Sequence, residues 1–262
     1  MSHPPRRCLP LRYLELFGLQ RSGTNYLQWL LEHNFSGARV LVAETGWKHG
    51  PVPVAIDGSG RDWHDPDWPP EVAEPFAERR LAALGPAGIE DLERAFGTCR
   101  FLYVFVVEDP YAWCASFARY AGRDLGDSAL GAIELWGRRN RHWLDVARRF
   151  ADRSRMVRYE DLLADSEAAL APLVRLSVKR TSRPWQEMRR RMTPRGVPSI
   201  RAFDRDYYLQ GRYLERYDHA TLSTVGRALR GDLVLQLGYG PQGARAPPRD
   251  RYSPEQIAIH EH

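Results

Sequence analysis

The chain has 262 residues, of which 43% are hydrophobic, enough to bury one α/β core without disulfides or metal ions. Its net charge of +5 is a small excess of basic over acidic residues, too small to indicate nucleic acid binding by itself. Such an excess suits a site for a multiply anionic small molecule. No stretch approaches the roughly 20 apolar residues that span a bilayer. Three widely spaced cysteines form neither a disulfide framework nor a zinc pattern. We therefore expect a cytoplasmic protein with no membrane span and no nucleic acid partner.

The first hundred residues predict strands that alternate with helices. Residues 12–17 are short, aromatic and apolar, and they stop at Gly18, which is typical of a strand. A glycine-containing loop and a helix to about residue 33 follow. The further elements expected here are a strand at 39–43 and helices near 70–84 and 88–97.

The strongest strand candidate is the continuous apolar run 101–107, which is typical of a central parallel strand. Asp109 and Pro110 then have the pattern of a helix N-cap and first helical position. The remaining elements expected are a helix at 128–150, a strand at 155–159, a helix at 166–177, a basic and partly irregular segment at 179–206, and one or two helices within 207–237.

Alternating strands and helices predict a three-layer α/β domain, P-loop-like, with a mostly parallel central sheet. We find no internal repeat and no linker, so we expect one domain over residues 1–240. Residues 241–262 begin with a segment rich in Pro, Gly and Arg, and we expect a loosely ordered tail.

The loop from Gly18 to Asn25 predicts an anion site. Its two glycines, Gly18 and Gly23, are separated by four residues, the spacing of a nucleotide P-loop. Glycines allow a tight turn in which backbone N–H groups point at an anion, and the following helix adds the positive end of its dipole. Such a spacing also occurs by chance between a strand and a helix.

A Walker loop would carry Lys and then Ser or Thr after the second glycine, whereas this chain has Thr24 and Asn25. The cation of the loop is Arg21, two residues before Gly23. The loss of the Walker lysine counts against hydrolysis of ATP or GTP.

With its Gln-Arg-Ser-Gly-Thr-Asn loop, the sequence resembles the sulfotransferase family, which uses 3′-phosphoadenosine 5′-phosphosulfate (PAPS) as co-substrate and no metal ion. Three segments in order carry this resemblance: Gly18 to Leu30, Val106 to Tyr120, and Val157 to Leu162. The resemblance implies that Arg21 contacts the sulfuryl group and that PAPS is bound by Gln20, Arg21, Ser22, Gly23, Thr24, Asn25, Ser116 and Tyr159. For Ser116 and Tyr159 a place in the core is the alternative. We expect Trp113 and Trp143, at helical positions among apolar neighbours, to lie in the core rather than in the site.

Glu108 departs from the family pattern. The family usually carries Arg or Lys at this position, where it pairs with the 3′-phosphate, and a carboxylate beside a phosphate dianion is repulsive. Arg119, Arg123 or the basic segment around 189–195 could supply the positive charge instead.

Lys48 and His49 are the best catalytic pair in the chain. They follow an apolar strand, so we expect them at the strand's carboxyl end, where ligands of open α/β sheets bind. Sulfuryl transfer to a hydroxyl or amine needs a base, and histidine suits this role near neutral pH. Glu44 is a rival for that role, and a surface histidine is the structural alternative.

The leading hypothesis is therefore a PAPS-dependent sulfotransferase with catalytic residues His49, Lys48 and Arg21. The alternatives are a small-molecule kinase on the same scaffold and a non-catalytic nucleotide-binding protein. The acceptor would be a small molecule or a glycan, since Trp47, Trp63 and Trp68 suggest an aromatic pocket. His64, Asp65 and Asp67 could suggest a metal, but their Pro and Trp neighbours favour a substrate lid, and we predict no metal site. The sequence does not indicate an oligomeric state.

Overall fold

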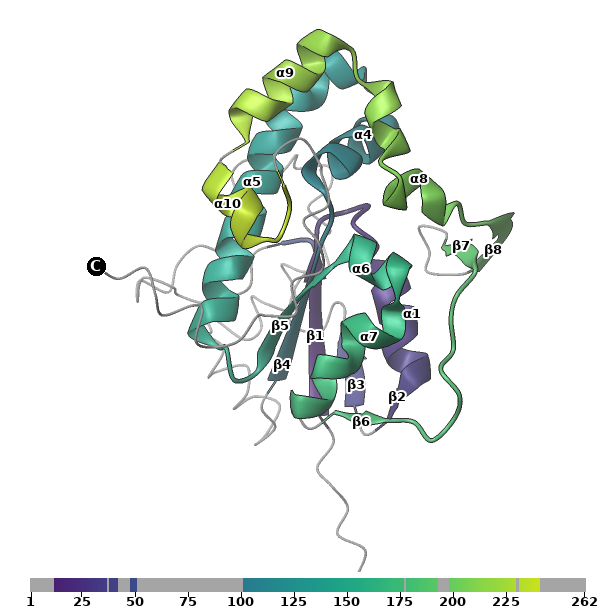
Figure 1. Ribbon diagram of the computed structural model, residues 1–262. Helices are drawn as coiled ribbons and strands as arrows, with labels where there is room; N and C mark the ends of the chain where they lie inside the picture. Colours follow the sequence, from purple (N-terminus) through teal and green to yellow (C-terminus); the bar gives the residue numbers. More distant parts are fainter. Residues whose placement is uncertain are drawn as a thin grey trace, which may run out of the picture.

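The structure is a computed structural model that describes residues 12–36, 38–41, 48–50, 101–176, 178–192, 198–229 and 231–240. A four-stranded sheet of order β3-β1-β4-β5 forms its centre (Figure 1). All its neighbouring strands are parallel. The strands are β1 (Arg12–Gly18), β3 (Ala38–Leu41), β4 (Phe101–Val107) and β5 (Ser154–Arg158).

Strand β4 is buried on both faces, as its continuous apolar sequence predicts. Tyr103, Phe105 and Val107 belong to one hydrophobic cluster, and the residues between them belong to a second. The first cluster is covered by α4 (Pro110–Tyr120), α5 (Leu125–Arg149) and α9 (His219–Ala228), and the second by α1 (Thr24–Asn34), α6 (Tyr159–Ala164) and α7 (Ser166–Leu170).

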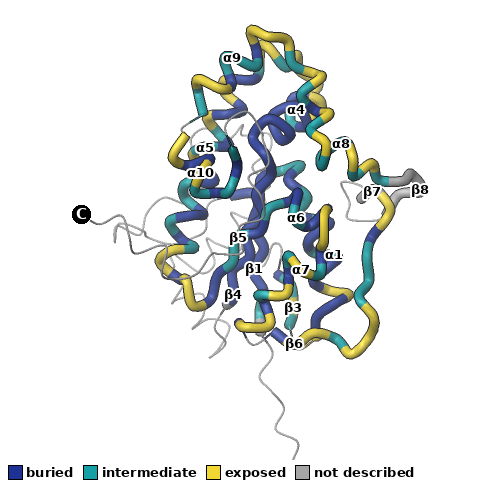
Figure 2. Tube along the Cα trace, in the orientation of Figure 1, coloured by how far each residue is buried: buried dark blue, intermediate teal, exposed yellow. Residues whose placement is uncertain are grey.

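Figures 1 and 2 show the resulting three layers, with β1 and β4 mostly dark blue between helices whose outer faces are exposed. The predicted three-layer α/β fold with a parallel sheet is therefore confirmed. Trp113 and Trp143 are fully buried in the first cluster, which confirms the expected core position of both.

Local capping chemistry sets the helix starts. Asp109 accepts hydrogen bonds from the backbone N–H groups of Tyr111 (2.9 Å) and Ala112 (3.1 Å), and Pro110 opens α4, as predicted. Helix α5 begins three residues earlier than predicted, because Asp124 accepts from the N–H of Gly126 at 2.8 Å and caps it there.

The predicted helix at 166–177 is shorter than expected. It is α-helical only to Leu170, and Ala171–Leu176 form a 3-10 helix, η1. Pro172 explains the difference, since it has no N–H to donate to the preceding turn and its ring clashes with that turn. The strand predicted at 155–159 ends at Arg158, and Tyr159 opens α6.

The carboxyl-terminal part is more divided than the predicted one or two helices. It contains α8 (Arg205–Leu209), η2 (Arg212–Arg216), α9 and α10 (Gly231–Gln236). Gly211, with a φ of 69°, turns the chain between α8 and η2. Two antiparallel pairs were not predicted, β2 (Phe35–Ser36) with β6 (Lys179–Arg180) and β7 (Arg190–Met192) with β8 (Pro198–Ala202).

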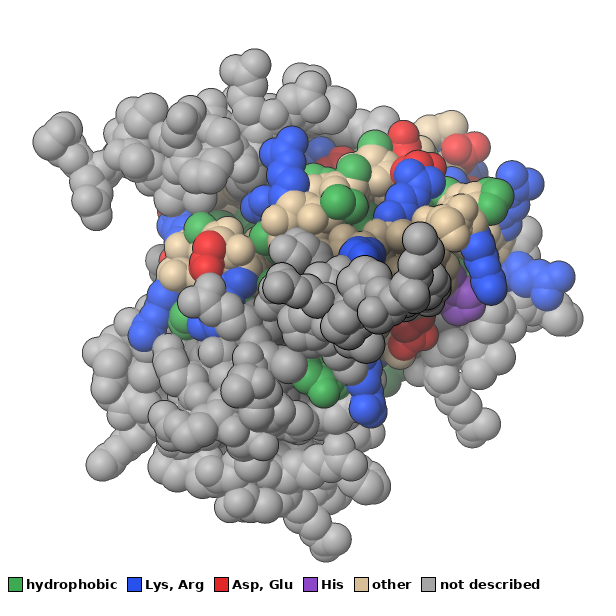
Figure 3. Space-filling model, turned by 90° about the horizontal axis from the view of Figure 1, so that it is seen from below, with side chains coloured by type: hydrophobic (Ala, Val, Ile, Leu, Met, Phe, Trp, Pro, Cys, Tyr) green, Lys and Arg blue, Asp and Glu red, His purple; other side chains and the backbone are tan. Residues whose placement is uncertain are grey.

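Several predicted features lie outside the described residues, namely the helices near 70–84 and 88–97 and the tail 241–262. Among the described helices, none is both long and apolar enough to cross a bilayer. Seen from below, the described Lys and Arg side chains are spread among other side chains and do not form one continuous patch on that face (Figure 3).

Candidate functional site

The carboxyl ends of the four parallel strands bring the candidate residues together. The loop Gly18–Asn25 follows β1, Glu108 and Asp109 follow β4, and Tyr159 and Glu160 follow β5. The order β3-β1-β4-β5 places the second strand of the sheet in sequence on one side of β1 and the third on the other. Such a reversal of strand order forms the crevice in which open α/β sheets bind ligands.

Two close approaches explain the glycines of the loop. A Cβ atom on Gly18 would lie 2.4 Å from Cγ1 of Val106 on the neighbouring strand. Gly23 has a φ of 82°, and its Cβ would lie 2.3 Å from the ring of Tyr159. The loop is therefore packed directly against the ends of β4 and β5, and a side chain at either position would displace it.

Three further contacts brace the loop from within. Trp113 donates from Nε1 to the carbonyl of Gln20 at 2.7 Å. The N–H and the hydroxyl of Ser22 both donate to the carbonyl of Leu19, at 3.1 and 2.7 Å. Arg21 has a φ of 73°, an uncommon conformation for a residue with a side chain. Such local strain persists where the surrounding contacts hold it, and it is frequent at ligand sites.

Helix α1 presents its amino terminus to this loop. Gly23 is its N-cap, no side-chain hydrogen bond caps it in the described structure, and its first turn holds no acidic residue. Thr24 is buried and Asn25 is half-buried at this end. The first N–H groups of the helix and its dipole therefore favour an anion at this place.

Lys48 approaches the same helix end from the segment that follows β3. Its Nζ donates to Oδ1 of Asn25 at 2.5 Å, and its carbonyl accepts from the N–H of Gly18 at 2.9 Å. Burial lowers the pKa of Lys48 to about 8. The amine remains mostly protonated at neutral pH and supplies a second positive charge beside the loop.

His49 lies under the loop. Its Nδ1 is 2.6 Å from the carbonyl oxygen of Gly18, so this nitrogen carries the proton and Nε2 the lone pair. Burial, together with the charge of Lys48, lowers the pKa of His49 to about 3. The ring is neutral at physiological pH, and the structural alternative of an exposed surface histidine is wrong, because only 9% of the residue is exposed.

Arg21 extends from the loop toward α4. The centre of its guanidinium lies 5.6 Å from the centroid of the Tyr120 ring on α4. Its Nε is buried and has no hydrogen-bond partner among the described residues.

Beneath the loop lies a group of three buried carboxyl side chains, Glu108, Asp109 and Glu160. Glu160 accepts from the N–H of Asp109 at 2.9 Å and from the hydroxyl of Tyr239 at 2.8 Å. Burial raises the pKa of Asp109 to about 6 and that of Glu160 to about 7. Burial and the two neighbouring carboxyls raise the pKa of Glu108 well above its usual range.

The other predicted site residues lie around this centre. Ser116 is buried on α4, and Tyr159 is buried with its ring against Gly23. Arg119 and Arg123 are exposed at and beyond the end of α4. The rival base Glu44, the tryptophans 47, 63 and 68, and the 64–67 segment lie outside the described residues. In the part of the chain that the structure describes, no cluster of His, Cys, Asp and Glu could hold a metal ion.

A polar network that sequence reasoning missed joins α1 to the carboxyl-terminal half. Tyr26, in the first turn of α1, donates to Oε1 of Glu187 at 2.5 Å, and Arg205 of α8 pairs with the same oxygen at 2.7 Å. Ser166 donates to Oε2 at 2.5 Å. These residues lie as many as 179 positions apart, so no local pattern signals their contact. The network holds α8, which carries Tyr208, near the loop.

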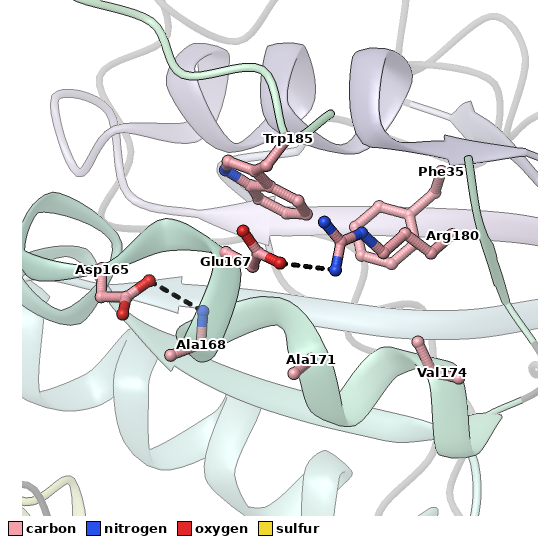
Figure 4. A pocket seen from close by; sticks show the side chains of 8 residues that line it. All are labelled: Phe35, Asp165, Glu167, Ala168, Ala171, Val174, Arg180 and Trp185. Atoms are coloured by element: carbon pink, nitrogen blue, oxygen red, sulfur yellow. Dashed lines mark hydrogen bonds and ion pairs between the residues drawn. The ribbon is translucent and has the colours of Figure 1, made fainter. Parts of the chain in front are cut away.

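A surface hollow of about 270 Å³ lies at the far end of α1. The aromatic rings of Phe35 and Trp185 line it, and Arg180 pairs with Glu167 at its edge (Figure 4). Phe35 directly follows the 11-residue helix α1, so this hollow lies about 16 Å from the loop at a rise of 1.5 Å per residue. It is separate from the strand-end site.

No family model matches the chain, and no curated protein matches it. The solved structures that are similar to it include two sulfotransferase domains. One is a sulfotransferase domain from the Synechococcus PCC 7002 olefin synthase, with 17% identity and a TM-score of 0.44, covering 88% of this chain and 95% of that one. The other is a sulfotransferase domain from the curacin biosynthetic pathway, with 15% identity and a TM-score of 0.43, covering 88% and 99%. At these identities the likeness concerns the fold alone.

Proposed function

We propose that the chain is a sulfotransferase that moves a sulfuryl group from PAPS to a hydroxyl or amine of a small-molecule or glycan acceptor. The observation that carries this proposal is the amino terminus of α1, which has no side-chain cap and where Lys48 donates to Asn25, while the preceding loop contributes Arg21. Neither cation occupies the Walker position. Positive groups in these positions can stabilise the negative charge that develops during transfer of an anionic group, and they do so without a Walker lysine.

In the proposed reaction, the acceptor oxygen or nitrogen attacks sulfur, and the bond between sulfur and the bridging phosphate oxygen breaks. Negative charge grows on that bridging oxygen as 3′-phosphoadenosine 5′-phosphate leaves. We assign the stabilisation of this charge to Arg21 and Lys48, together with the N–H groups of Gly23, Thr24 and Asn25. Groups placed in advance where charge develops lower the barrier more than uniform substrate binding does.

His49 is assigned as the base that takes the acceptor proton at Nε2. Its Nδ1 contact with the Gly18 carbonyl orients the ring and selects the tautomer that has a lone pair at Nε2. Burial opposes protonation of this ring, whereas the negative charge of a bound donor favours it. We assign Ser116 and Tyr159 to the nucleotide, and Gln20 and Ser22 to the shape of the loop.

Ligand-dependent thermal stability tests the proposal. We expect 3′-phosphoadenosine 5′-phosphate to raise Tm and ATP with Mg²⁺ to leave it unchanged. The reverse pattern would indicate a kinase. Stabilisation by the nucleotide without transfer of sulfate to any acceptor in a mass-spectrometric screen would indicate a non-catalytic binding protein.

Two variants with matched controls test the roles of the assigned residues. We expect Lys48→Ala and His49→Ala each to lower turnover by about 100-fold or more. The exposed residues Lys179, on β6, and His219, on α9, provide the controls, since their replacement by Ala removes a side chain of the same type outside the loop. Wild-type turnover in His49→Ala would exclude His49 as the base.

A further inference from the structure

Glu108 is the least satisfied buried group of the candidate site. It is 1% exposed, and neither of its carboxyl oxygens has a hydrogen-bond partner among the described residues. Burial of a polar group without a partner is costly, and such groups in native proteins call for an explanation. The backbone carbonyl of Glu108, in contrast, does have a partner, because it accepts a hydrogen bond from Nε1 of Trp136 at 3.0 Å.

Arg21 shows the same feature on the other side of the site. Its Nε is buried and has no hydrogen-bond partner among the residues that the structure describes, although the charge of Arg21 is near enough to lower the pKa of Glu108. These two groups of opposite type share one buried region, yet they do not pair with each other within the described structure. A ligand oxygen that accepts hydrogen bonds would satisfy both, since the guanidinium and a protonated carboxyl are both donors.

The surroundings of Glu108 decide its protonation state. The titratable and charged groups that face it are Asp109 at the start of α4, Tyr159 and Glu160 on α6, Arg21 in the loop, Tyr208 on α8 and Tyr213 on η2. Asp109 and Glu160 already accept hydrogen bonds from the backbone and from tyrosine hydroxyls. Of the three carboxyl groups, Glu108 is therefore the one that most strongly favours the neutral form.

We propose that Glu108 is a neutral carboxylic acid that donates its O–H to an anionic phosphate or sulfate oxygen of the ligand held by the Gly18–Asn25 loop. Glu108 follows β4, whose residue Val106 pairs with Gly18, so its carboxyl lies beside the start of the loop. A neutral acid in an apolar site is a strong donor to an anion, whereas an ionised one would repel it. The identity of the ligand as PAPS rests on the proposed function; the contact itself requires only an anion.

This arrangement predicts opposite effects on stability and on binding. Replacing Glu108 by Met removes a buried polar group without a partner and keeps a side chain of similar length. We expect Glu108→Met to raise Tm of the ligand-free protein by a few degrees and to weaken anion binding about 10-fold or more. A residue with a purely structural role would lose stability instead.

The binding test uses wild type, Glu108→Gln and Glu108→Met with two probes, inorganic pyrophosphate and 3′-phosphoadenosine 5′-phosphate, measured by calorimetry. The amide of Gln is a neutral donor at every pH, so we expect Glu108→Gln to bind within about threefold of wild type at neutral pH. As pH rises and Glu108 ionises, wild-type affinity falls relative to Glu108→Gln. Lys48, whose pKa is about 8, loses its charge at alkaline pH in both proteins, so the comparison between them cancels that effect.

The outcomes are separable. Wild-type affinity in Glu108→Met would overturn the proposal. Much tighter binding by Glu108→Gln than by wild type at neutral pH would also overturn it, because Glu108 would then be ionised and repulsive at that pH. Loss of binding in Glu108→Gln would also overturn it. If wild type binds pyrophosphate with this pattern but does not prefer the nucleotide, the proposed function fails and the role of Glu108 stands.

Discussion

Glu108 and Glu160 lie just beyond the ends of two paired parallel strands, β4 and β5, and both are buried, yet their surroundings differ. The carboxyl oxygens of Glu160 accept hydrogen bonds from the N–H of Asp109 and the hydroxyl of Tyr239. Glu108 has no hydrogen-bond partner for either oxygen in the described part of the chain. Burial raises the pKa of both groups.

The difference separates two uses of a buried carboxyl. The end of β5 is closed by contacts within the protein, and it supports the loop through the ring of Tyr159 against Gly23. At the end of β4, Glu108 has a hydrogen bond to its backbone carbonyl, whereas its side chain has none among the described residues and lies near the loop cation Arg21. We infer that the Glu160 carboxyl maintains the fold, whereas the Glu108 carboxyl is arranged for a ligand at some cost in stability.

The largest effect should come from replacing Glu160 by Met. This change leaves the buried N–H of Asp109 without its acceptor, so we expect the free energy of unfolding to fall by about 3 kcal/mol. Urea denaturation of Glu160→Met beside Glu108→Met measures the contrast directly. Equal losses in both variants would break the distinction between the two strand ends.

A smaller effect is expected at the contact between the two regions. Gly23→Ala would place a methyl group within 2.3 Å of the Tyr159 ring at a φ of 82°. Gly122, with a φ of 64° and open space around its Cβ position, is the matched control for backbone strain alone. We expect Gly23→Ala to lose about 2 kcal/mol more than Gly122→Ala. Equal losses would show that Tyr159 does not press on the loop, and a combined Gly23→Ala and Tyr159→Ala protein should recover part of the difference.

Much of this framework follows from local chemistry that the sequence displays. The apolar run of β4, the cap at Asp109 and the glycine loop depend on residues within a few positions of one another, and all three were predicted. Pro172 was also visible, and its effect on the helix that begins at Ser166 was overlooked.

The features that were not predictable depend on contacts between distant residues. Lys48 meets Asn25 across 23 positions, and Tyr26 meets Glu187 across 161. Glu108 was expected to repel a phosphate as a carboxylate, an argument that assumes the ordinary pKa of an exposed group. Its protonation depends on burial beside Asp109 and Glu160, which only the folded chain brings together.

The smallest expected effect concerns the ring that lies beside Arg21. Tyr120 is 53% exposed, so its replacement should leave the unfolding free energy nearly unchanged. A cation over an exposed aromatic ring contributes about 0.5–1 kcal/mol. Tyr120→Leu should therefore weaken binding of pyrophosphate about two- to fivefold, whereas Tyr120→Phe keeps the ring and should bind as wild type does. Calorimetry on both variants measures this difference. An unchanged affinity in Tyr120→Leu would mean that Arg21 reaches the anion without this support, which leaves Lys48 and the helix terminus to orient the ligand.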